Sequence, residues 1–162
     1  MIATKLKNYL DDNDIKYVLI RHSPAYTAQE VAQSAHIPGV DMAKTTIIKL
    51  GSKLVMAVLP SSYHINFQRL ANALGHDNAH LASEEEFHER FPDCELGAMP
   101  PFGNLYGMDT YVAESLSKEK EIYFNAGNHI ELVRMYYVDY ERLANPRIIS
   151  FTDRLDAFPL HR

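Results

Sequence analysis

The chain has 162 residues, 46% of them hydrophobic and 23% charged, which suits one globular domain with a buried core. No apolar run approaches the roughly 20 residues that cross a bilayer. Residues 1–14 lack the apolar centre of a signal peptide, so we expect a cytoplasmic protein without membrane contact. The single cysteine, Cys94, excludes an internal disulfide. The net charge of −5 argues against DNA, or any long nucleic acid held on a basic surface.

In chain order, the first structural signals are short and local. Apolar residues at helical spacing predict a helix over residues 2–13, and β-forming residues predict a strand over 16–20. Thr27 and Glu30 have the spacing of a capping box. This pair predicts a short helix that begins there and ends near residue 36.

A glycine-first pair, Gly51 and Ser52, separates two apolar β-forming runs and predicts a tight hairpin of strands 45–50 and 53–59. Signals of the same kinds predict the later elements. These are helices over 66–74, 83–91 and 139–144, a loop over 97–107, and strands over 110–113, 121–124 and 130–135. Strands joined by hairpins, with helices between them, predict a single α+β domain rather than a doubly wound parallel sheet.

Lys44 is the first candidate for chemistry, because it stands at the mouth of an apolar strand after a Pro-Gly turn. From there its ammonium can offer three donors to a phosphate or an ester carbonyl. Partial burial would lower its pKa. The alternative is an edge-strand lysine that prevents the sheet from pairing with another chain.

Two glycine-containing segments are further candidates. The loop from Gly97 to Gly103 has prolines between its glycines and can hold backbone amides against a developing oxyanion, although a rigid surface turn has the same sequence features. Residues 125–129 can place the Gly127 amide and the His129 ring near a ligand, and they also suit a plain hairpin turn.

Motifs of several other enzyme classes are missing from the sequence. There is no HExxH pattern, so His76, His80 and His88 are interpreted as solvated loop histidines and no metal is expected. There is no G-x-S-x-G elbow, which argues against a serine-triad hydrolase. Neither a dinucleotide nor an ATP loop occurs, so no cofactor is expected.

Taken together, four segments in this order resemble the YbaK/prolyl-tRNA-synthetase-associated family of editing domains. They are residues 22–32 (HSPAYTAQEVA), 43–45 (AKT), 97–103 (GAMPPFG) and 124–127 (FNAG). The resemblance covers roughly residues 15–143. The chain departs from many relatives at Pro100, where they carry a small polar residue, and this affects the expected shape of the pocket.

The resemblance implies an α+β fold with a twisted mixed sheet curled into a partial barrel and helices packed outside. It implies hydrolysis of the ester in a mischarged tRNA, with tRNA for proline carrying a small wrong amino acid as the expected substrate. The partners would be the aminoacyl-tRNA 3′ end and an aminoacyl-tRNA synthetase. The editing domain would span residues 1–146, and residues 147–162 would form a C-terminal extension packed on it or touching a partner subunit.

The resemblance also assigns roles to individual residues. Lys44 would be the functional lysine, and Gly97, Pro101 and Gly103 would complete the catalytic set by shaping the acyl pocket. The implied substrate-binding residues are His22, Tyr26, Thr27, Phe102, Gly127 and His129. Two alternatives remain: a non-catalytic module that binds aminoacyl-tRNA, a synthetase or a nucleotide, and a hydrolase of small aminoacyl esters or thioesters.

Overall fold

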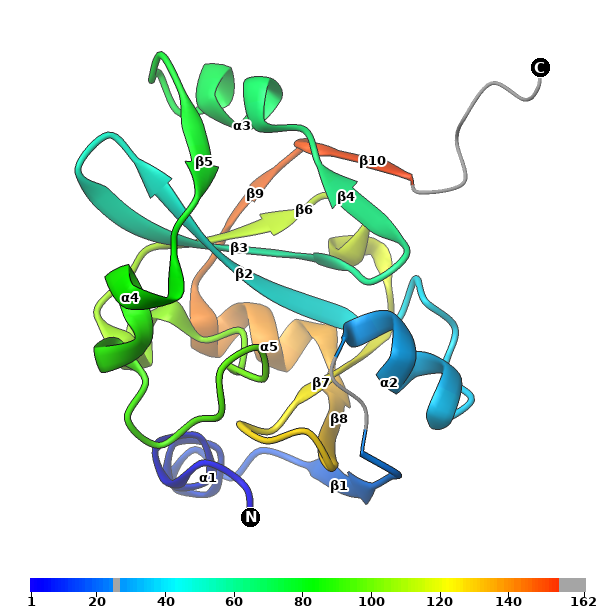
Figure 1. The fold of residues 1–162 in the computed structure, drawn as a ribbon. Coiled ribbons are helices and arrows are strands. Elements are labelled where there is room, and N and C mark those ends of the chain that lie inside the picture. Colours follow the sequence, from blue (N-terminus) through cyan, green and yellow to red (C-terminus); the bar gives the residue numbers. More distant parts are fainter. Residues whose placement is uncertain (25–26, 155–162) are drawn as a thin grey trace, which may run out of the picture.

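A computed structural model describes residues 1–24 and 27–154 (Figure 1). Its α-helices are α1 (Thr4–Asp12), α2 (Ala28–Ser34), α3 (Phe67–Ala73), α4 (Glu84–Phe87) and α5 (Tyr137–Ala144). Its strands are β1 (Tyr17–Arg21), β2 (Ala43–Leu50), β3 (Lys53–Pro60), β4 (Tyr63–Ile65), β5 (Ala79–Leu81), β6 (Thr110–Ala113), β7 (Glu121–Asn125), β8 (Glu131–Tyr136), β9 (Arg147–Ile149) and β10 (Thr152–Arg154).

The largest sheet has the order β5-β2-β3-β6-β9 and is mixed. Strands β2 and β3 form an antiparallel hairpin around Gly51, whose φ of 65° only glycine adopts without strain. Strands β6 and β9 add to it in parallel. Alternation along β2 sends Ala43 and Ile47 to one hydrophobic core and Ile48 and Leu50 to another on the opposite face.

A second, antiparallel sheet has the order β1-β8-β7 and is covered on both faces. One face packs on α1 and α5 in the main core. The other face packs on α2, where Leu132 of β8 meets Val31 and Ala32 in a smaller cluster. We call this second side the α2 face.

The two sheets meet where β2 begins. Met42 forms an isolated parallel bridge with Tyr123 of β7, and the Tyr123 N–H donates to the Asp41 carbonyl at 3.0 Å. In Figure 1 α2 lies at this junction, beside the start of β2 and next to β7. The junction therefore brings the segment that contains Lys44 alongside the β7–β8 hairpin.

The predicted α+β class and mixed sheet are confirmed, as is the capping box at Thr27–Glu30, and a second capping box joins Ser83 and Glu86. The described strands divide into three sheets rather than one, the third being the pair β10-β4. Strands β4, β5, β9 and β10 were not predicted, because three residues are too few to show a period of two. Within the described residues, no helix has the length and apolar character needed to span a membrane.

Candidate active site

The pleat places Lys44 on the same side of its segment as Met42, which packs in the α2 cluster. Bridged residues point to the same side of a sheet, and both Met42 and Tyr123 pack in the α2 cluster. Two residues further along each strand, Lys44 and Asn125 return to that side. Asn125 lies opposite Leu132, another member of the α2 cluster, which agrees with this orientation.

The Lys44 side chain is half-buried, and burial lowers the pKa of its ammonium below the ordinary value. In the part of the chain that the structure describes, no carboxylate or hydrogen-bond acceptor pairs with it. This differs from Lys49, five residues along the same strand, which forms an ion pair with Glu86. Among the described residues Lys44 is therefore a half-buried cation without a partner, as expected of a group that meets a ligand.

His22 reaches the same face from β1. Its N–H donates to the Ile130 carbonyl at 2.8 Å, so the pleat continues from Ile20 to His22. The Nδ1 atom lies 2.7 Å from the Ser23 carbonyl, which can only accept, so Nδ1 carries the hydrogen. The Nε2 atom is buried and has no partner among the described residues, which leaves it as an acceptor.

Thr27 caps α2 beside this face. Its hydroxyl oxygen accepts from the Glu30 N–H at 3.0 Å, and its own N–H donates to the Glu30 carboxylate at 3.1 Å. The structure thus gives the Thr27 side chain a defined role in starting the helix. The expected role of Tyr26 lies outside the described residues.

A second group of site residues forms where the loop before Pro100 meets the β7–β8 turn. The Glu95 N–H donates to the Gly127 carbonyl at 2.8 Å, and the Gly127 N–H donates to the Ala98 carbonyl at 3.0 Å. A Cβ added at Gly97 would lie 3.6 Å from Nε2 of His129. The two glycine-containing segments that the sequence singled out are therefore in contact.

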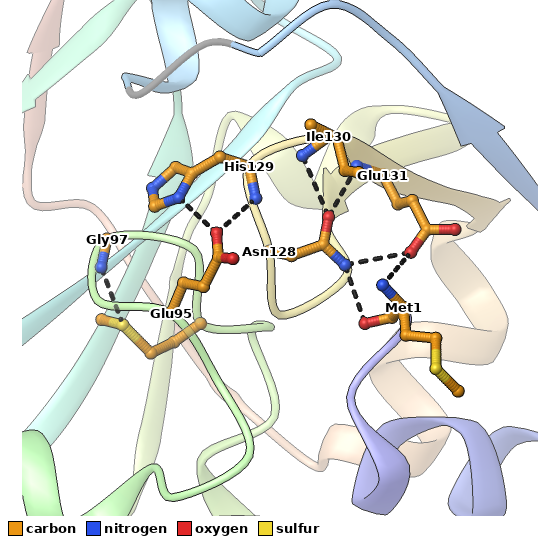
Figure 2. A network of polar contacts seen from close by, with 8 residues as sticks. Met1, Glu95, Gly97, Asn128, His129, Ile130 and Glu131 are labelled. Atoms are coloured by element: carbon orange, nitrogen blue, oxygen red, sulfur yellow. Dashed lines mark hydrogen bonds and ion pairs between the residues drawn. The ribbon is translucent and has the colours of Figure 1, made fainter.

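Glu95 orients His129 within this group (Figure 2). One carboxylate oxygen of Glu95 accepts from the His129 backbone N–H at 2.9 Å and lies 2.7 Å from the ring Nδ1. The His129 side chain is 13% exposed. A carboxylate that fixes both backbone and ring sets the orientation of the imidazole and keeps the hydrogen on Nδ1. Sequence reasoning missed Glu95, which lies 34 residues from its partner.

The backbone amides of the three glycines differ in whether they are free to donate to an oxyanion. The amides of Gly103 and Gly127 are already engaged, with Thr110 Oγ1 at 3.0 Å and the Ala98 carbonyl at 3.0 Å. The Gly97 amide has only the Met99 thioether sulfur, at 3.3 Å, and a thioether is a weak acceptor. The amide of Gly97 is thus the one that a ligand oxygen can recruit without breaking a strong bond.

Gly103 and Gly127 are needed for close packing instead. A Cβ on Gly103 would come within 2.5 Å of Thr110 Oγ1, and one on Gly127 within 2.6 Å of the Ala3 Cβ. Gly127 also has a φ of 99°, which side-chain-bearing residues rarely adopt. These glycines allow the close packing of the loop and the hairpin, and their expected site roles stay predictions.

The structure places Phe102 in the core, and its expected contact with substrate stays a prediction. Phe102 is fully buried and packs edge-on against Phe124 and Tyr140, at centroid distances of 5.7 and 5.1 Å. Pro101 is buried beside it, and its carbonyl accepts from the Tyr140 hydroxyl at 2.7 Å. A large apolar side chain within the 97–103 loop anchors the loop to the core, because burying it is worth more than exposing it to a polar ligand.

Cys94 is not available as a nucleophile. Burial raises the pKa of its thiol to about 12, so the thiolate is scarce at neutral pH. The thiol lies 3.4 Å from both the Tyr106 hydroxyl and Asp93. These contacts belong to the packing around Tyr106.

The fold and the site define a small α+β domain with a partly buried lysine and buried acceptors on one face of a sheet. Residues 22–143 match the sequence profile of the aminoacyl-tRNA editing domain, and the chain belongs to that family. The family resemblance stated from the four sequence segments is confirmed.

Two curated relatives share part of their sequence with the chain. The multifunctional Ser/Thr-tRNA deacylase ProXp-y of Escherichia coli (strain K12) is 35% identical over 99 residues, which cover 60% of this chain and 58% of that protein. A proline–tRNA ligase of Thermosipho africanus (strain TCF52B) is 30% identical over 77 residues, 48% of this chain and 14% of the ligase. The matches thus span little more than half of the first relative and a small part of the second.

Solved structures share the fold. A hypothetical protein superposes with a TM-score of 0.81 at 17% identity, covering 92% of this chain and 99% of that one. A candidate trans-editing enzyme for prolyl-tRNA synthetase superposes with a TM-score of 0.78 at 18% identity, covering 93% and 96%. At these identities the likeness concerns the fold alone.

Proposed function

We propose that the protein is a hydrolase that cleaves the ester between the tRNA 3′ end and a wrongly attached small amino acid. The observation that carries this proposal is Lys44, a half-buried ammonium without a protein partner in the described residues, within the segment that matches the editing family. We expect serine, threonine or alanine to be the amino acid removed. The name of the E. coli relative supports the first two, and tRNA for proline is the expected carrier.

Ester hydrolysis needs positive charge or donors near the carbonyl oxygen and a positioned water. Lys44 holds the acyl carbonyl or the terminal phosphate, and the Gly97 amide donates to the oxygen that becomes negative. The Glu95-oriented His129 lines the acyl pocket beside Gly97. No step requires a covalent intermediate, which agrees with the raised pKa of the Cys94 thiol.

Such a second site has a physical purpose. A synthetase pocket gains only about 1–3 kcal/mol from one methylene, so it admits smaller or isosteric amino acids that a separate hydrolytic site must remove. Similarity to a segment of a proline–tRNA ligase supports an aminoacyl-tRNA synthetase as a partner beside the tRNA 3′ end. The cytoplasmic location stays a prediction.

The finer architecture belongs to this proposal. The five-stranded and three-stranded sheets, joined at Met42 and Tyr123, would form two walls of the partial barrel. Residues 1–146 would be the editing domain. Pairing of β9 with β6 and of β10 with β4 supports an extension packed on that domain rather than on a partner subunit.

A deacylation panel tests the proposal. The purified protein is incubated with seryl-, threonyl-, alanyl- and cysteinyl-tRNA for proline, with correctly charged tRNAs as controls. Release of one mismatched amino acid, abolished in Lys44→Ala, is the expected result. A folded wild-type protein that releases none of them would contradict the proposal.

The runner-up is a non-catalytic module that binds aminoacyl-tRNA. The net charge of −5 favours a module that binds a synthetase instead, because docking on a protein does not need a surface that attracts RNA. The same panel separates the two functions. Saturable binding of a mischarged tRNA without faster hydrolysis would identify the binding module.

A further inference from the structure

Asn125, the last residue of β7, has a buried acceptor that the protein leaves unsatisfied. Its side chain is 6% exposed, and its Oδ1 has no hydrogen-bond partner among the described residues. Buried polar atoms are almost always paired, so an orphan needs a reason. The sequence presented Asn125 only as the start of a turn, because an unpaired atom cannot be seen before the strand register is known.

A second asparagine in the same hairpin shows what a structural role looks like. The Asn128 Oδ1 accepts from the N–H groups of Ile130 and Glu131 at 2.9 and 2.8 Å. Its Nδ2 donates to the Met1 carbonyl and to the Glu131 carboxylate (Figure 2). Asn128 is 5% exposed, so burial alone does not explain why Asn125 lacks a partner.

The orphan acceptor and the cation of the proposed site lie on neighbouring segments of the chain. Met42 forms an isolated parallel bridge with Tyr123, so Lys44 and Asn125 each lie two residues beyond a bridged residue, and Asn125 lies opposite Leu132 on the α2 face. His22 Nε2, the other orphan acceptor on this face, comes from the same sheet. A ligand that completes the face must offer an acceptor to Lys44 and a donor to Asn125 at neighbouring positions.

We propose that Asn125 Oδ1 is a substrate-binding atom that accepts a hydrogen bond from the ribose hydroxyl adjacent to the ester. This inference rests on the proposed function. An aminoacyl-adenosine has two donors near its ester carbonyl, the neighbouring ribose hydroxyl and the α-ammonium. The ammonium would share its surroundings with Lys44, and like charges within a partly buried site repel. The neutral hydroxyl is not repelled by Lys44, so Asn125 accepts from the ribose rather than from the amino acid.

Binding measurements test this without requiring turnover. The probe is adenosine that carries alanine through a stable 3′-amide, compared by calorimetry with its 2′-deoxy counterpart. Asn125→Leu keeps the size of the side chain and removes the acceptor. We expect it to weaken binding of the hydroxyl probe about tenfold, the effect of one hydrogen bond, and to leave binding of the deoxy probe unchanged.

Thermal unfolding adds a readout that a structural role would move. Because Asn125 Oδ1 has no protein partner, Asn125→Leu should keep or raise the melting temperature of the free protein. Asn128→Leu, which removes four hydrogen bonds, should lower it. A fall in Asn125→Leu as large as that in Asn128→Leu would assign Asn125 to the fold and overturn the proposal.

The remaining outcomes are also decisive. Equal losses for both probes, no loss for either, or no binding of the hydroxyl probe by the wild type would overturn the ribose contact. If the Asn125→Leu loss of affinity disappears only for a probe that lacks the α-amino group, Oδ1 accepts from the amine instead of the ribose. Deacylation of charged tRNA is measured separately, so hydroxyl-dependent binding without turnover would sink the proposed hydrolase and keep the Asn125 site.

Discussion

At the scale of single residues, the partly buried charge of Lys44 lowers the stability of the fold and is proposed to serve substrate binding. Its environment opposes the charged form, so Lys44→Met, which keeps the unbranched stem, should maintain or raise the free energy of unfolding at pH 7 while deacylation is lost. Because burial lowers the folded pKa of Lys44 below 10.5, the folded wild type binds fewer protons than the unfolded chain at pH values between the folded pKa and 10.5. Its stability should therefore rise with pH there, and the rise should be missing in the variant.

Urea unfolding at pH 7 and pH 9, together with the deacylation assay, checks this expectation. Lys49→Met is the matched control on the same strand. It removes a lysine that is paired with Glu86, so it should lose stability and keep activity. Full activity in Lys44→Met would remove Lys44 from the mechanism.

In the proposed mechanism Glu95 is a positioning residue, since it would act on the substrate only through His129. Glu95→Ala removes the contacts of Glu95 with the His129 backbone and ring. Because the imidazole is then no longer held in place, we expect KM for the mischarged tRNA to rise about tenfold, the effect of one hydrogen bond. Glu95→Gln retains an amide oxygen in the same place and should recover most of the loss. If the glutamine variant is as impaired as the alanine variant, charge rather than position is the contribution of Glu95.

At the scale of elements, the site depends on how closely α1, the loop and the β7–β8 hairpin approach one another. Gly127→Ala and Gly97→Ala both place a side chain at positive φ, 99° and 86°. Only the first clashes, since its Cβ would meet Ala3 at 2.6 Å, whereas that of Gly97 has 3.6 Å to His129. We expect Gly127→Ala to destabilise the protein by about 1–3 kcal/mol more than Gly97→Ala, the cost of overpacking. Similar melting temperatures for the two variants would contradict this.

The junction between the two sheets should make stability depend on pH. A hydrogen bond with Asp41, burial and the Asp41 charge raise the pKa of Glu119 to about 7 from 4.5. A raised folded pKa means that the folded state holds the extra proton, so its stabilisation is complete below pH 4.5 and is lost as pH rises through 7. Glu119→Gln keeps a donor toward Asp41 at every pH and should flatten this fall.

Chemical unfolding at several pH values between 4.5 and 8 measures the effect, with Glu114→Gln as a surface control. Glu114 is exposed and lies 4.0 Å from Lys118, so its removal should shift stability little and equally at each pH. A Glu119→Gln profile parallel to that of the wild type would show that the carboxyl pair does not share a proton.

At the scale of the whole molecule, the sequence predicted features with local causes. The Thr27–Glu30 capping box and the Gly51 turn each act within a few residues, and both occur as expected. The parallel pairing of β9 with β6 joins segments some 35 residues apart and leaves no periodic signal in three residues. Register, and with it the sharing of one face by Lys44 and Asn125, follows only from such distant pairings.

The candidate site divides in the same way. Lys44, Gly97 and His129 were predicted because their residue types and motif spacing suit the chemistry. The burial of Phe102 was not foreseen, because a motif does not distinguish a residue that lines a pocket from one that anchors the loop behind it.

The charge of the whole chain limits how the substrate can be held. A net charge of −5 repels the tRNA body, so contact should be confined to the 3′ end, where Lys44 provides one cation. For single-stranded RNA, the slope of log affinity against log salt is roughly −0.7 for each neutralised phosphate, so we expect a slope between 0 and about −1.5. The affinity is measured between roughly 50 and 300 mM salt for a tRNA that carries its amino acid through a stable 3′-amide and for a minihelix with the same 3′ end. These titrations show whether about one phosphate is neutralised on binding. The two RNAs should bind alike, and Lys44→Met should bring the slope toward zero. A slope of about −4, together with much weaker binding of the minihelix, would contradict this expectation. It would mean that a basic surface binds the tRNA body and that this surface, rather than the pocket, selects the RNA.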